Sequence, residues 1–215
     1  MNSIKDTPIV LIGGGGHASV LADTLLKQKR KIAAIISPND IKRRLVFSGI
    51  RQLFNDEDIL EFKNDEVLLV NGIGIVPKSD LRYRINEYFL SLGYKFTAVI
   101  SSDALVSEYA LIREGAQILP RAIVQAGAEI GEHTIINSGA LVEHDSLIGM
   151  YCHIAPNVTI CGEVHIGNEV YVGAGATIIN SLELADQVVV GAGTTIVRDI
   201  VDPQVIVSAK NRVLD

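Results

Sequence analysis

The sequence lacks a long hydrophobic run, and its first residues lack the pattern of a secretory signal. No segment approaches the roughly 18 consecutive apolar residues that a membrane-spanning helix requires. The apolar stretch in MNSIKDTPIVLIGGGG is short and ends in glycines, which makes it a poor export signal. With 48% hydrophobic and 20% charged residues, the composition is typical of a soluble globular protein. We therefore expect a cytoplasmic protein without a membrane span.

Cysteine is scarce, and so is any large excess of positive charge. The two cysteines, Cys152 and Cys161, cannot make a disulfide framework or a zinc knuckle. Residues 1–100 carry 14 Lys and Arg against 11 Asp and Glu, a balance of +3, and residues 101–215 carry 5 against 14, a balance of −9. The basic excess is far too small for a nucleic-acid-binding surface, but it suits a small anionic ligand.

A repeat of six residues runs through the second half of the chain. The 17 successive positions hold Ile100, Val106, Ile112, Ile118, Val124, Ile130, Ile136, Val142, Ile148, Ile154, Ile160, Ile166, Val172, Ile178, Leu184, Val190 and Ile196. Small residues, mostly alanine, stand four places after the earlier members. Glycine often follows the aliphatic residue directly, as at Gly131, Gly149, Gly167, Gly173 and Gly191. A period of six fits neither a helix face nor a coiled-coil seam.

A hexapeptide β-helix accounts for this period. Each coil would be a triangle of three hexapeptides, with the aliphatic residue packed inside every face. The small residue tolerates crowding near a corner, and the glycine is expected to permit the backbone turn. The 17 repeats predict about five to six coils of 18 residues.

The first hundred residues alternate between strand and helix patterns. Apolar runs predict strands at residues 8–13, 31–37, 66–72 and 95–101, with helices at 17–29 and 78–93. This alternation predicts a parallel sheet with right-handed crossovers, which binds ligands at the carboxyl ends of its strands. We therefore predict two domains: a small Rossmann-like α/β domain over residues 1–99, and a β-helix with a C-terminal tail over residues 100–215.

A glycine-rich loop, GGGGHA, joins the first predicted strand to the first helix. Gly13, Gly15 and Ala18 fit the pattern G-x-G-x-x-A, in which the backbone approaches a phosphate at a helix N-terminus. NAD is disfavoured because Ser37 stands where an acidic residue would hold the ribose, and because the domain is too short for a second mononucleotide-binding half. A nucleoside-diphosphate sugar fits better. The alternative is that the glycines serve only a tight turn.

The histidines of the repeat are the candidates for catalysis. His144 occupies the third position of its hexapeptide, which faces outward, and Glu143 and Asp145 flank it. A general base needs a pKa near neutrality and a partner that orients its ring, and the adjacent carboxylates supply such a partner. His144 is therefore the predicted base, and the alternative is a solvent-facing histidine without a function. Cys152 and Cys161 have no evident base beside them in the repeat, so a cysteine nucleophile is disfavoured.

The chain resembles the bacterial nucleotide-sugar acetyltransferases of the sialic-acid O-acetyltransferase-like group. That group includes the N-acetyltransferases of bacillosamine, viosamine and perosamine synthesis. The segments IGGGGHASV, VEHDSLIG, VGAGATI and VGAGTTIV carry the resemblance, which spans both halves. It implies a left-handed parallel β-helix, a homotrimer, and acetyl-CoA in the groove between neighbouring prisms, without a metal ion.

The resemblance also implies roles for individual residues. It makes His144 the general base and Asp145 the residue that raises its basicity. It places three residues near acetyl-CoA, namely His153, Ala174 and Ala192. It places six residues around the nucleotide sugar, namely Gly15, Gly16, His17, Ser37, Pro38 and Gly72. The last segment, VSAKNRVLD, departs from the Gly-x-Pro-Ala-Lys pattern of relatives.

We therefore expect an acetyl-CoA-dependent N-acetyltransferase that acts on the 4-amino group of a UDP-linked 4-amino-4,6-dideoxy-sugar, for a bacterial surface glycan or glycoprotein. Three alternatives stay open: a sugar O-acetyltransferase, for example of sialic acid, a zinc lyase of the carbonic anhydrase type, and a nucleotide-sugar-binding scaffold without catalysis. The zinc lyase is disfavoured because it needs three converging histidines. The spacings of 11, 9 and 12 between His133, His144, His153 and His165 include no close pair.

Overall fold

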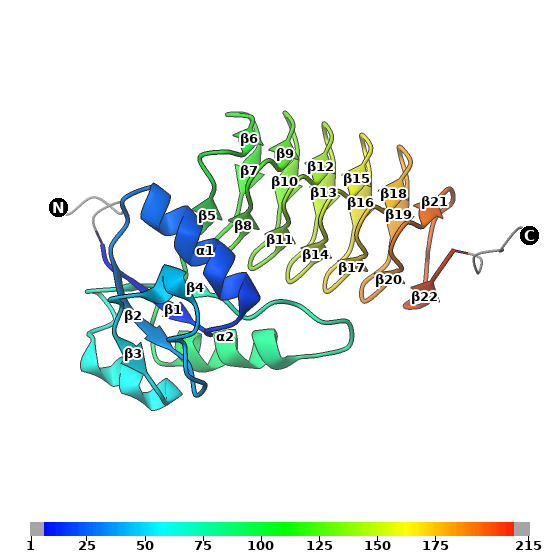
Figure 1. Cartoon of the computed structure of the whole chain (residues 1–215). Helices are drawn as coiled ribbons and strands as arrows, with labels where there is room; N and C mark the ends of the chain where they lie inside the picture. The colour runs from blue at the N-terminus through cyan, green and yellow to red at the C-terminus, as the bar shows by residue number, and fades with distance from the viewer. Residues whose placement is uncertain (1–6, 209–215) are drawn as a thin grey trace, which may run out of the picture. The chain divides into compact units, whose positions relative to one another are not determined.

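The computed structural model describes residues 7–208, and the chain divides into two compact units after Ser102 (Figure 1). The boundary predicted from the sequence lies between residues 99 and 100. The segment VSAKNRVLD lies largely outside the described residues. Among residues 7–208, no helix is both long enough and apolar enough to cross a membrane.

The first unit is built on a four-stranded parallel sheet with the strand order β3-β2-β1-β4. Its elements are β1 (Ile9–Ile12), α1 (Gly16–Lys27), β2 (Ile32–Ile36), the 3₁₀ helix η1 (Leu45–Phe47), β3 (Gln52–Leu53), the 3₁₀ helix η2 (Asp56–Glu61), β4 (Leu68–Asn71), α2 (Leu81–Ser91) and β5 (Val99–Ile100). In the middle of the sheet, Leu11 pairs with Ile35 on one side and with Val70 on the other. The predicted parallel sheet is confirmed.

A short glycine loop joins strand β1 to helix α1, at the end of the sheet where the parallel strands terminate. All four residues of β1 are buried, as expected for a strand covered on both faces. Helix α1 turns Leu21, Ala22 and Leu25 inward at the spacing of one helical face. The glycine loop therefore lies at the carboxyl end of β1, beside the N-terminus of α1.

Two parts of the first unit differ from the prediction. Residues 95–101 do not form a fourth strand of this sheet, because Phe96 makes only an isolated bridge to Leu69 and β5 is two residues long. The fourth strand is instead β3, which pairs with β2. Its two residues are too few to show a periodic pattern in the sequence.

The second unit is a parallel β-helix of two-residue strands. They are β6 (Leu105–Val106), β7 (Leu111–Ile112), β8 (Gln117–Ile118), β9 (Ile123–Val124), β10 (Glu129–Ile130), β11 (Ile135–Ile136), β12 (Leu141–Val142), β13 (Leu147–Ile148), β14 (His153–Ile154), β15 (Thr159–Ile160), β16 (His165–Ile166), β17 (Tyr171–Val172), β18 (Thr177–Ile178), β19 (Glu183–Leu184), β20 (Val189–Val190), β21 (Thr195–Ile196) and β22 (Val205–Ile206). The stacked coils are visible in Figure 1.

Three parallel sheets form the three faces of this prism. Within the second unit their orders are β19-β16-β13-β10-β7, β22-β20-β17-β14-β11-β8 and β21-β18-β15-β12-β9-β6. From β6 to β18, each strand pairs with the strand 18 residues further along, as Val142 does with Ile160, whereas β20 and β22 pair at a spacing of 16 residues. The predicted coil of three hexapeptides is therefore confirmed.

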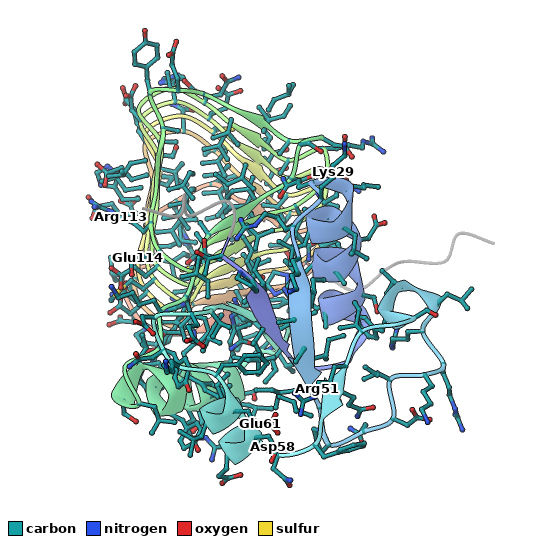
Figure 2. All side chains as sticks on the ribbon, turned by 90° about the vertical axis from the view of Figure 1, so that its left-hand side faces the viewer. Lys29, Arg51, Asp58, Glu61, Arg113 and Glu114 are labelled. Carbon is teal, nitrogen blue, oxygen red and sulfur yellow. The ribbon has the colours of Figure 1, made fainter. Side chains whose placement is uncertain are left out.

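The aliphatic repeat fills the inside of the coils. Fourteen of its 17 positions, from Ile118 to Ile196, are at most 4% exposed. The residue four places further is also buried, as Ala122 and Cys152 show. Charged residues lie outside: Figure 2 shows Arg113 and Glu114 at the outer surface of the coils. The hydrophobic core predicted from the period is confirmed, except that the first three positions are more exposed.

The glycines that follow the aliphatic residue have another role than the predicted one. Gly131, Gly149 and Gly173 do not have a positive φ. The chain turns two residues later, at a position whose φ is positive in every coil from residue 115 to residue 193. A Cβ at Gly149 would lie 2.5 Å from the carbonyl oxygen of Gly167 in the next coil. These glycines therefore allow close stacking of the coils rather than the turn.

Candidate active site

His144 and Asp145 form the corner that follows strand β12. Asp145 has a φ of 57°, the left-handed conformation that turns the chain toward the next face. Nδ1 of His144 lies 2.9 Å from Oδ2 of Asp145. An ionised carboxylate only accepts hydrogen bonds, so Nδ1 donates and the lone pair of the neutral ring is on Nε2. This tautomer is the one that a general base at Nε2 requires.

Carboxylates around the ring favour its protonated form. The hydrogen bond to Asp145 raises the pKa of His144 above its ordinary value, and the charges of Asp145, Glu143 and Glu163 act in the same direction. Partial desolvation of the ring works against them. The side chain of His144 is 57% exposed, so solvent screens these interactions. The ring is therefore more basic than an ordinary histidine, and Asp145 holds its orientation.

The neighbouring coils approach this pair closely on both sides. Gly162 lies beside the ring, because a Cβ there would be only 2.6 Å from Nε2 of His144. Gly127 lies beside the carboxylate, because a Cβ there would be 2.2 Å from Oδ1 of Asp145. The N–H of Glu163 donates to the carbonyl oxygen of His144 at 3.0 Å, which ties the corner to the next coil.

The residues predicted near acetyl-CoA lie elsewhere on the prism. His153 belongs to β14 and is 8% exposed, with its Nε2 3.1 Å from Nδ2 of Asn137 and its ring edge-on to Tyr171. Ala174 and Ala192 are exposed at the corners that follow β17 and β20. That edge differs from the edge of His144, which follows β12. Within one chain, the structure does not bring the predicted base and the predicted acetyl-CoA contacts together.

Cys152 does not offer a nucleophile. Burial raises the pKa of its thiol to about 12, so the thiolate is scarce at neutral pH. Its Sγ lies 3.0 Å from the carbonyl oxygen of Gly167, inside the prism. Among residues 7–208, no group of three or more His, Cys, Asp and Glu is placed to hold a metal ion.

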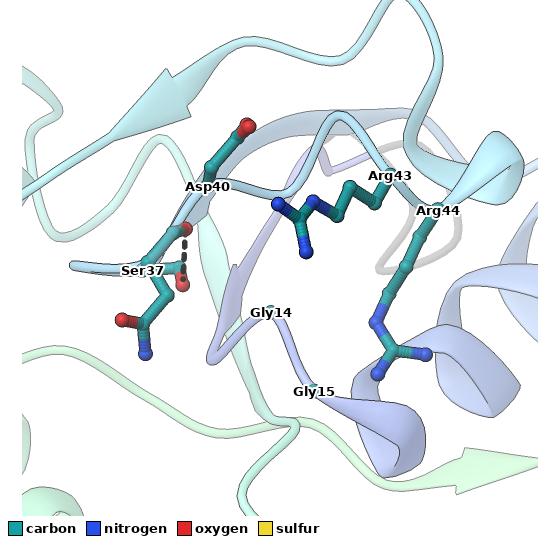
Figure 3. Close-up of a pocket in the computed structure, with 7 residues that line it drawn as sticks. Gly14, Gly15, Ser37, Asp40, Arg43 and Arg44 are labelled. Carbon is teal, nitrogen blue, oxygen red and sulfur yellow. Dashed lines mark hydrogen bonds between the residues drawn. The ribbon is translucent and has the colours of Figure 1, made fainter.

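A pocket of about 440 Å³ opens at the carboxyl ends of β1 and β2 (Figure 3). Its lining residues are Gly14, Gly15, Ser37, Asn39, Asp40, Arg43 and Arg44. A Cβ at Gly15 would meet no atom within 4 Å, so the loop presents bare backbone beside the N-terminus of α1. In Figure 3, Arg43 extends over the pocket and Arg44 reaches toward α1, where its Nη1 donates to Oγ of Ser19 at 3.4 Å. Two guanidinium groups and a helix N-terminus make this pocket favourable for an anion.

One wall of the pocket is fixed by side-chain hydrogen bonds. Nε2 of Gln52 donates to the carbonyl oxygens of Ser37 and Asn39, at 2.8 Å each. Ser37 is 3% exposed, and its hydroxyl donates to the carbonyl oxygen of Asn39 at 3.1 Å. The N–H of Lys42 donates to Oδ1 of Asp40 at 2.9 Å. This segment, from strand β2 to the two arginines, is therefore held in a defined conformation.

The pocket includes only part of the predicted substrate residues. Gly15 and Ser37 line it, whereas Gly16, His17, Pro38 and Gly72 are not among its lining residues. Gly72 packs against helix α1, since a Cβ there would lie 2.6 Å from Cβ of Ala18. His17 faces the segment after β4, and its Cβ lies 3.7 Å from where a Cβ of Gly74 would be.

Arg43, Arg44 and Asn39 line the pocket but were not predicted from the sequence as site residues. The signal was present in the run NDIKRR directly after the second predicted strand. Basic residues that follow a strand at the ligand-binding edge of a parallel sheet are candidates for holding phosphate. The absence of any periodic pattern in this run explains why it drew no structural prediction.

Two family models match the chain, one over each unit. Residues 8–89 match the PglD N-terminal domain, and residues 109–144 and 145–180 match the bacterial transferase hexapeptide (six repeats). Among curated proteins, no match to the chain was found.

Solved structures match over nearly the whole length. The acetyltransferase domain of PglB from Neisseria gonorrhoeae FA1090, in complex with acetyl coenzyme A, is 26% identical, with 94% of this chain and 97% of that chain covered and a TM-score of 0.83. PerB from Caulobacter crescentus, in complex with CoA and GDP-perosamine, is 28% identical, with 94% of each chain covered and a TM-score of 0.81. WeeI from Acinetobacter baumannii AYE is 22% identical, covers 97% of this chain and 100% of its own, and has a TM-score of 0.80, which shows the shared fold.

These matches agree with the resemblance stated from the sequence and with the predicted left-handed β-helix. A PglD N-terminal domain precedes a hexapeptide prism here, and two of the solved structures match this arrangement over at least nine tenths of both chains. These matches indicate an acetyl-CoA-dependent acetyltransferase in which a PglD N-terminal domain is joined to a hexapeptide prism.

Proposed function

We propose that the protein transfers the acetyl group of acetyl-CoA to the 4-amino group of a UDP-linked 4-amino-4,6-dideoxy-sugar. The observation that carries this proposal is the outward-facing His144–Asp145 pair on the hexapeptide prism. Two similar structures support the substrate classes, since one is a complex with acetyl coenzyme A and the other a complex with CoA and GDP-perosamine. The pocket at the glycine loop of the first unit supports the nucleotide part of this substrate, because its lining favours an anion.

His144 would act as the general base of this transfer. As the sugar amine attacks the thioester carbonyl, Nε2 accepts the proton that the amine loses, and Asp145 stabilises the imidazolium that forms. Collapse of the tetrahedral intermediate breaks the C–S bond, and the departing sulfur takes up a proton as CoA is released. The backbone N–H of Gly162 is the proposed donor to the oxyanion, because Gly162 lies directly beside Nε2 and has no side chain to cover it.

The pocket at β1 and β2 would hold the nucleotide. We assign the diphosphate to the backbone of Gly14 and Gly15 and to the guanidinium groups of Arg43 and Arg44. Asp40 also lines the pocket, and a carboxylate there suits the hydroxyl groups of a ribose rather than the phosphates. His17 would approach the sugar from the other side of the loop.

Replacing both Arg43 and Arg44 by alanine is expected to raise KM for the nucleotide sugar by about 10- to 100-fold. A hydrogen bond to a charged group is worth about 1.5–3 kcal/mol, and each 1.4 kcal/mol is a factor of ten in affinity. KM for acetyl-CoA should stay unchanged. The control is Arg84→Ala, which removes an exposed arginine of α2 that pairs with Asp80. Equal increases in both KM values would show that the phosphates do not bind in this pocket.

The separation of His144 from Ala174 and Ala192 leads us to propose a homotrimer, in which each site combines two edges from neighbouring chains. Light scattering should then give about three times the 23.2 kDa of one chain. Co-expression of His144→Ala with Ala174→Arg tests the shared site. Each variant alone should be inactive, and mixed trimers should regain part of the activity, because one interface keeps both native residues. A fully active monomer, or mixtures without recovery, would contradict this assembly.

The substrate assignment is tested by offering acetyl-CoA with a panel of amino-sugars linked to UDP, dTDP or GDP, and by following free thiol. Rapid thiol release with a UDP-linked 4-amino-sugar is the expected result. Release only with dTDP- or GDP-linked sugars would correct the nucleotide. Release only with sialic acid or another hydroxyl acceptor would make the protein an O-acetyltransferase. If no acceptor leads to thiol release, the protein would be a nucleotide-sugar-binding scaffold without catalysis.

A further inference from the structure

The corners of the prism share one backbone conformation that does not demand glycine. In fourteen successive hexapeptides, the third residue after the inward aliphatic one has a positive φ. Nine of these residues are not glycine and have φ between 54° and 65°; they are Arg121, His133, Asp145, Tyr151, Asn157, Glu163, Glu169, Ser181 and Gln187. Glycine is favoured but not required at this position, so the surroundings of each glycine decide whether another residue would fit; nothing lies within 4 Å of a Cβ at Gly175 or Gly193.

At Gly127, the side chain of Asp145 leaves no room for a Cβ. A Cβ at Gly127 would lie 2.2 Å from Oδ1 of Asp145 and 3.2 Å from its Cγ, closer than side-chain atoms approach one another. The other carboxylate oxygen, Oδ2, accepts the hydrogen bond from Nδ1 of His144 at 2.9 Å. The carboxylate thus fills the space that a side chain at position 127 would occupy, and from there it holds the imidazole.

We propose that Gly127 is a positioning residue for the reaction, because its missing side chain leaves the space in which the carboxylate of Asp145 turns toward His144. The proposal rests on the proposed role of His144 as the base. Gly127 touches neither substrate nor reacting atom in this proposal, and it acts only through Asp145.

Alanine at position 127 would push the carboxylate away from the ring. His144 would then lose its hydrogen-bond partner, while the other carboxylates that face the ring, Glu143 and Glu163, would stay in place. Because the hydrogen bond to Asp145 is the largest cause of the raised pKa, the pKa of His144 should fall. A base with a lower pKa loses its proton at lower pH, so the acidic limb of the pH–rate profile should also move to lower pH.

The experiment is a proton NMR titration of the histidines in the native protein and in Gly127→Ala, with the His144 signal identified by its absence in His144→Ala. The His144 midpoint should fall in Gly127→Ala, as it should in Asp145→Asn. In the acetylation assay, kcat should fall with little change in either KM. The matched control is Gly115→Ala, which has a φ of 68° and whose Cβ would meet Nδ1 of His133 at 2.2 Å, on a different edge of the prism. That control should leave the His144 midpoint and kcat unchanged.

The double variant Asp145→Gly with Gly127→Ala keeps the proposal testable if Gly127→Ala folds poorly. Glycine at 145 tolerates the φ of 57° and removes the carboxylate that the new methyl group would strike. Relative to Gly127→Ala the double variant should regain thermal stability, and relative to Asp145→Gly its His144 midpoint should not move. A folded Gly127→Ala with an unchanged midpoint, or a double variant that regains no stability, would overturn the proposal. Because the titration needs no substrate, a fallen midpoint with an unchanged pH–rate profile would retain the link from Gly127 to Asp145 and reject His144 as the base.

Discussion

Replacement of His144 by alanine should lower kcat by about 10²–10⁴-fold, the usual contribution of a positioned general base. The hydrogen bond from Nδ1 to Asp145 leaves the lone pair of the ring on Nε2, the atom proposed to accept the proton. Affinity for acetyl-CoA should be nearly unchanged, because the residues proposed to contact the cofactor lie along the edge of Ala174 and Ala192. The measurement is kcat from thiol release at neutral pH, with acetyl-CoA binding followed by calorimetry.

A suitable control for this experiment is His165→Ala. His165 is an exposed histidine of strand β16, on another face of the same prism, and nothing in the structure assigns it to the site. It should retain native kcat. Near-native kcat in His144→Ala would show that the base lies elsewhere. His153 would then be the first residue to test, because the family resemblance places it near acetyl-CoA.

Removal of one inward side chain from the middle of the prism should have the largest effect on stability. Ile148→Ala deletes a side chain that is 3% exposed, and the cavity it leaves should lower the free energy of unfolding by about 2–5 kcal/mol. Stacked coils can relax little around such a cavity, because each strand is bonded to the coils above and below it. Urea unfolding followed by circular dichroism measures the change.

The matched control for Ile148→Ala is its neighbour in the same strand. Leu147 points to the opposite face and is 40% exposed, so Leu147→Ala should cost clearly less than Ile148→Ala. If the two variants lose similar stability, the alternation of inward and outward residues is not what holds the coil together. If the chain associates through this face, the stability lost in Leu147→Ala should depend on protein concentration.

The second unit could be predicted from the sequence almost completely, because one physical requirement repeats in every hexapeptide. Each inward position must be filled by an aliphatic side chain, so the period itself defines the fold. The role of the glycines was predicted wrongly for the same reason that the fold was predicted well. A one-dimensional pattern shows that Gly149 recurs with the repeat, but its close contact with Gly167 exists only between stacked coils.

The candidate site was predictable only where its residues are neighbours in sequence. His144 and Asp145 are adjacent, so their hydrogen bond could be expected from the sequence and is present in the structure. Arg43 and Arg44 reach their pocket through a segment held by Gln52, and no local pattern marks such a contact. The same holds for Gly127, whose relation to Asp145 appears only when one coil is laid on the next.

The pairing of residues 18 positions apart also limits how this protein can change in length during evolution. An insertion of six residues between Gly127 and His144 would preserve the aliphatic core and the turns, so the fold would survive it. It would nevertheless carry His144 to the next edge of the triangle and separate Asp145 from the glycine beneath it. A full coil inserted there would return His144 to its edge but would place a new residue beneath Asp145, so only a change of whole coils outside residues 127–145 keeps both in place. Lineages of this enzyme should therefore differ in prism length by whole coils on either side of the site, while the fold alone would tolerate any multiple of six.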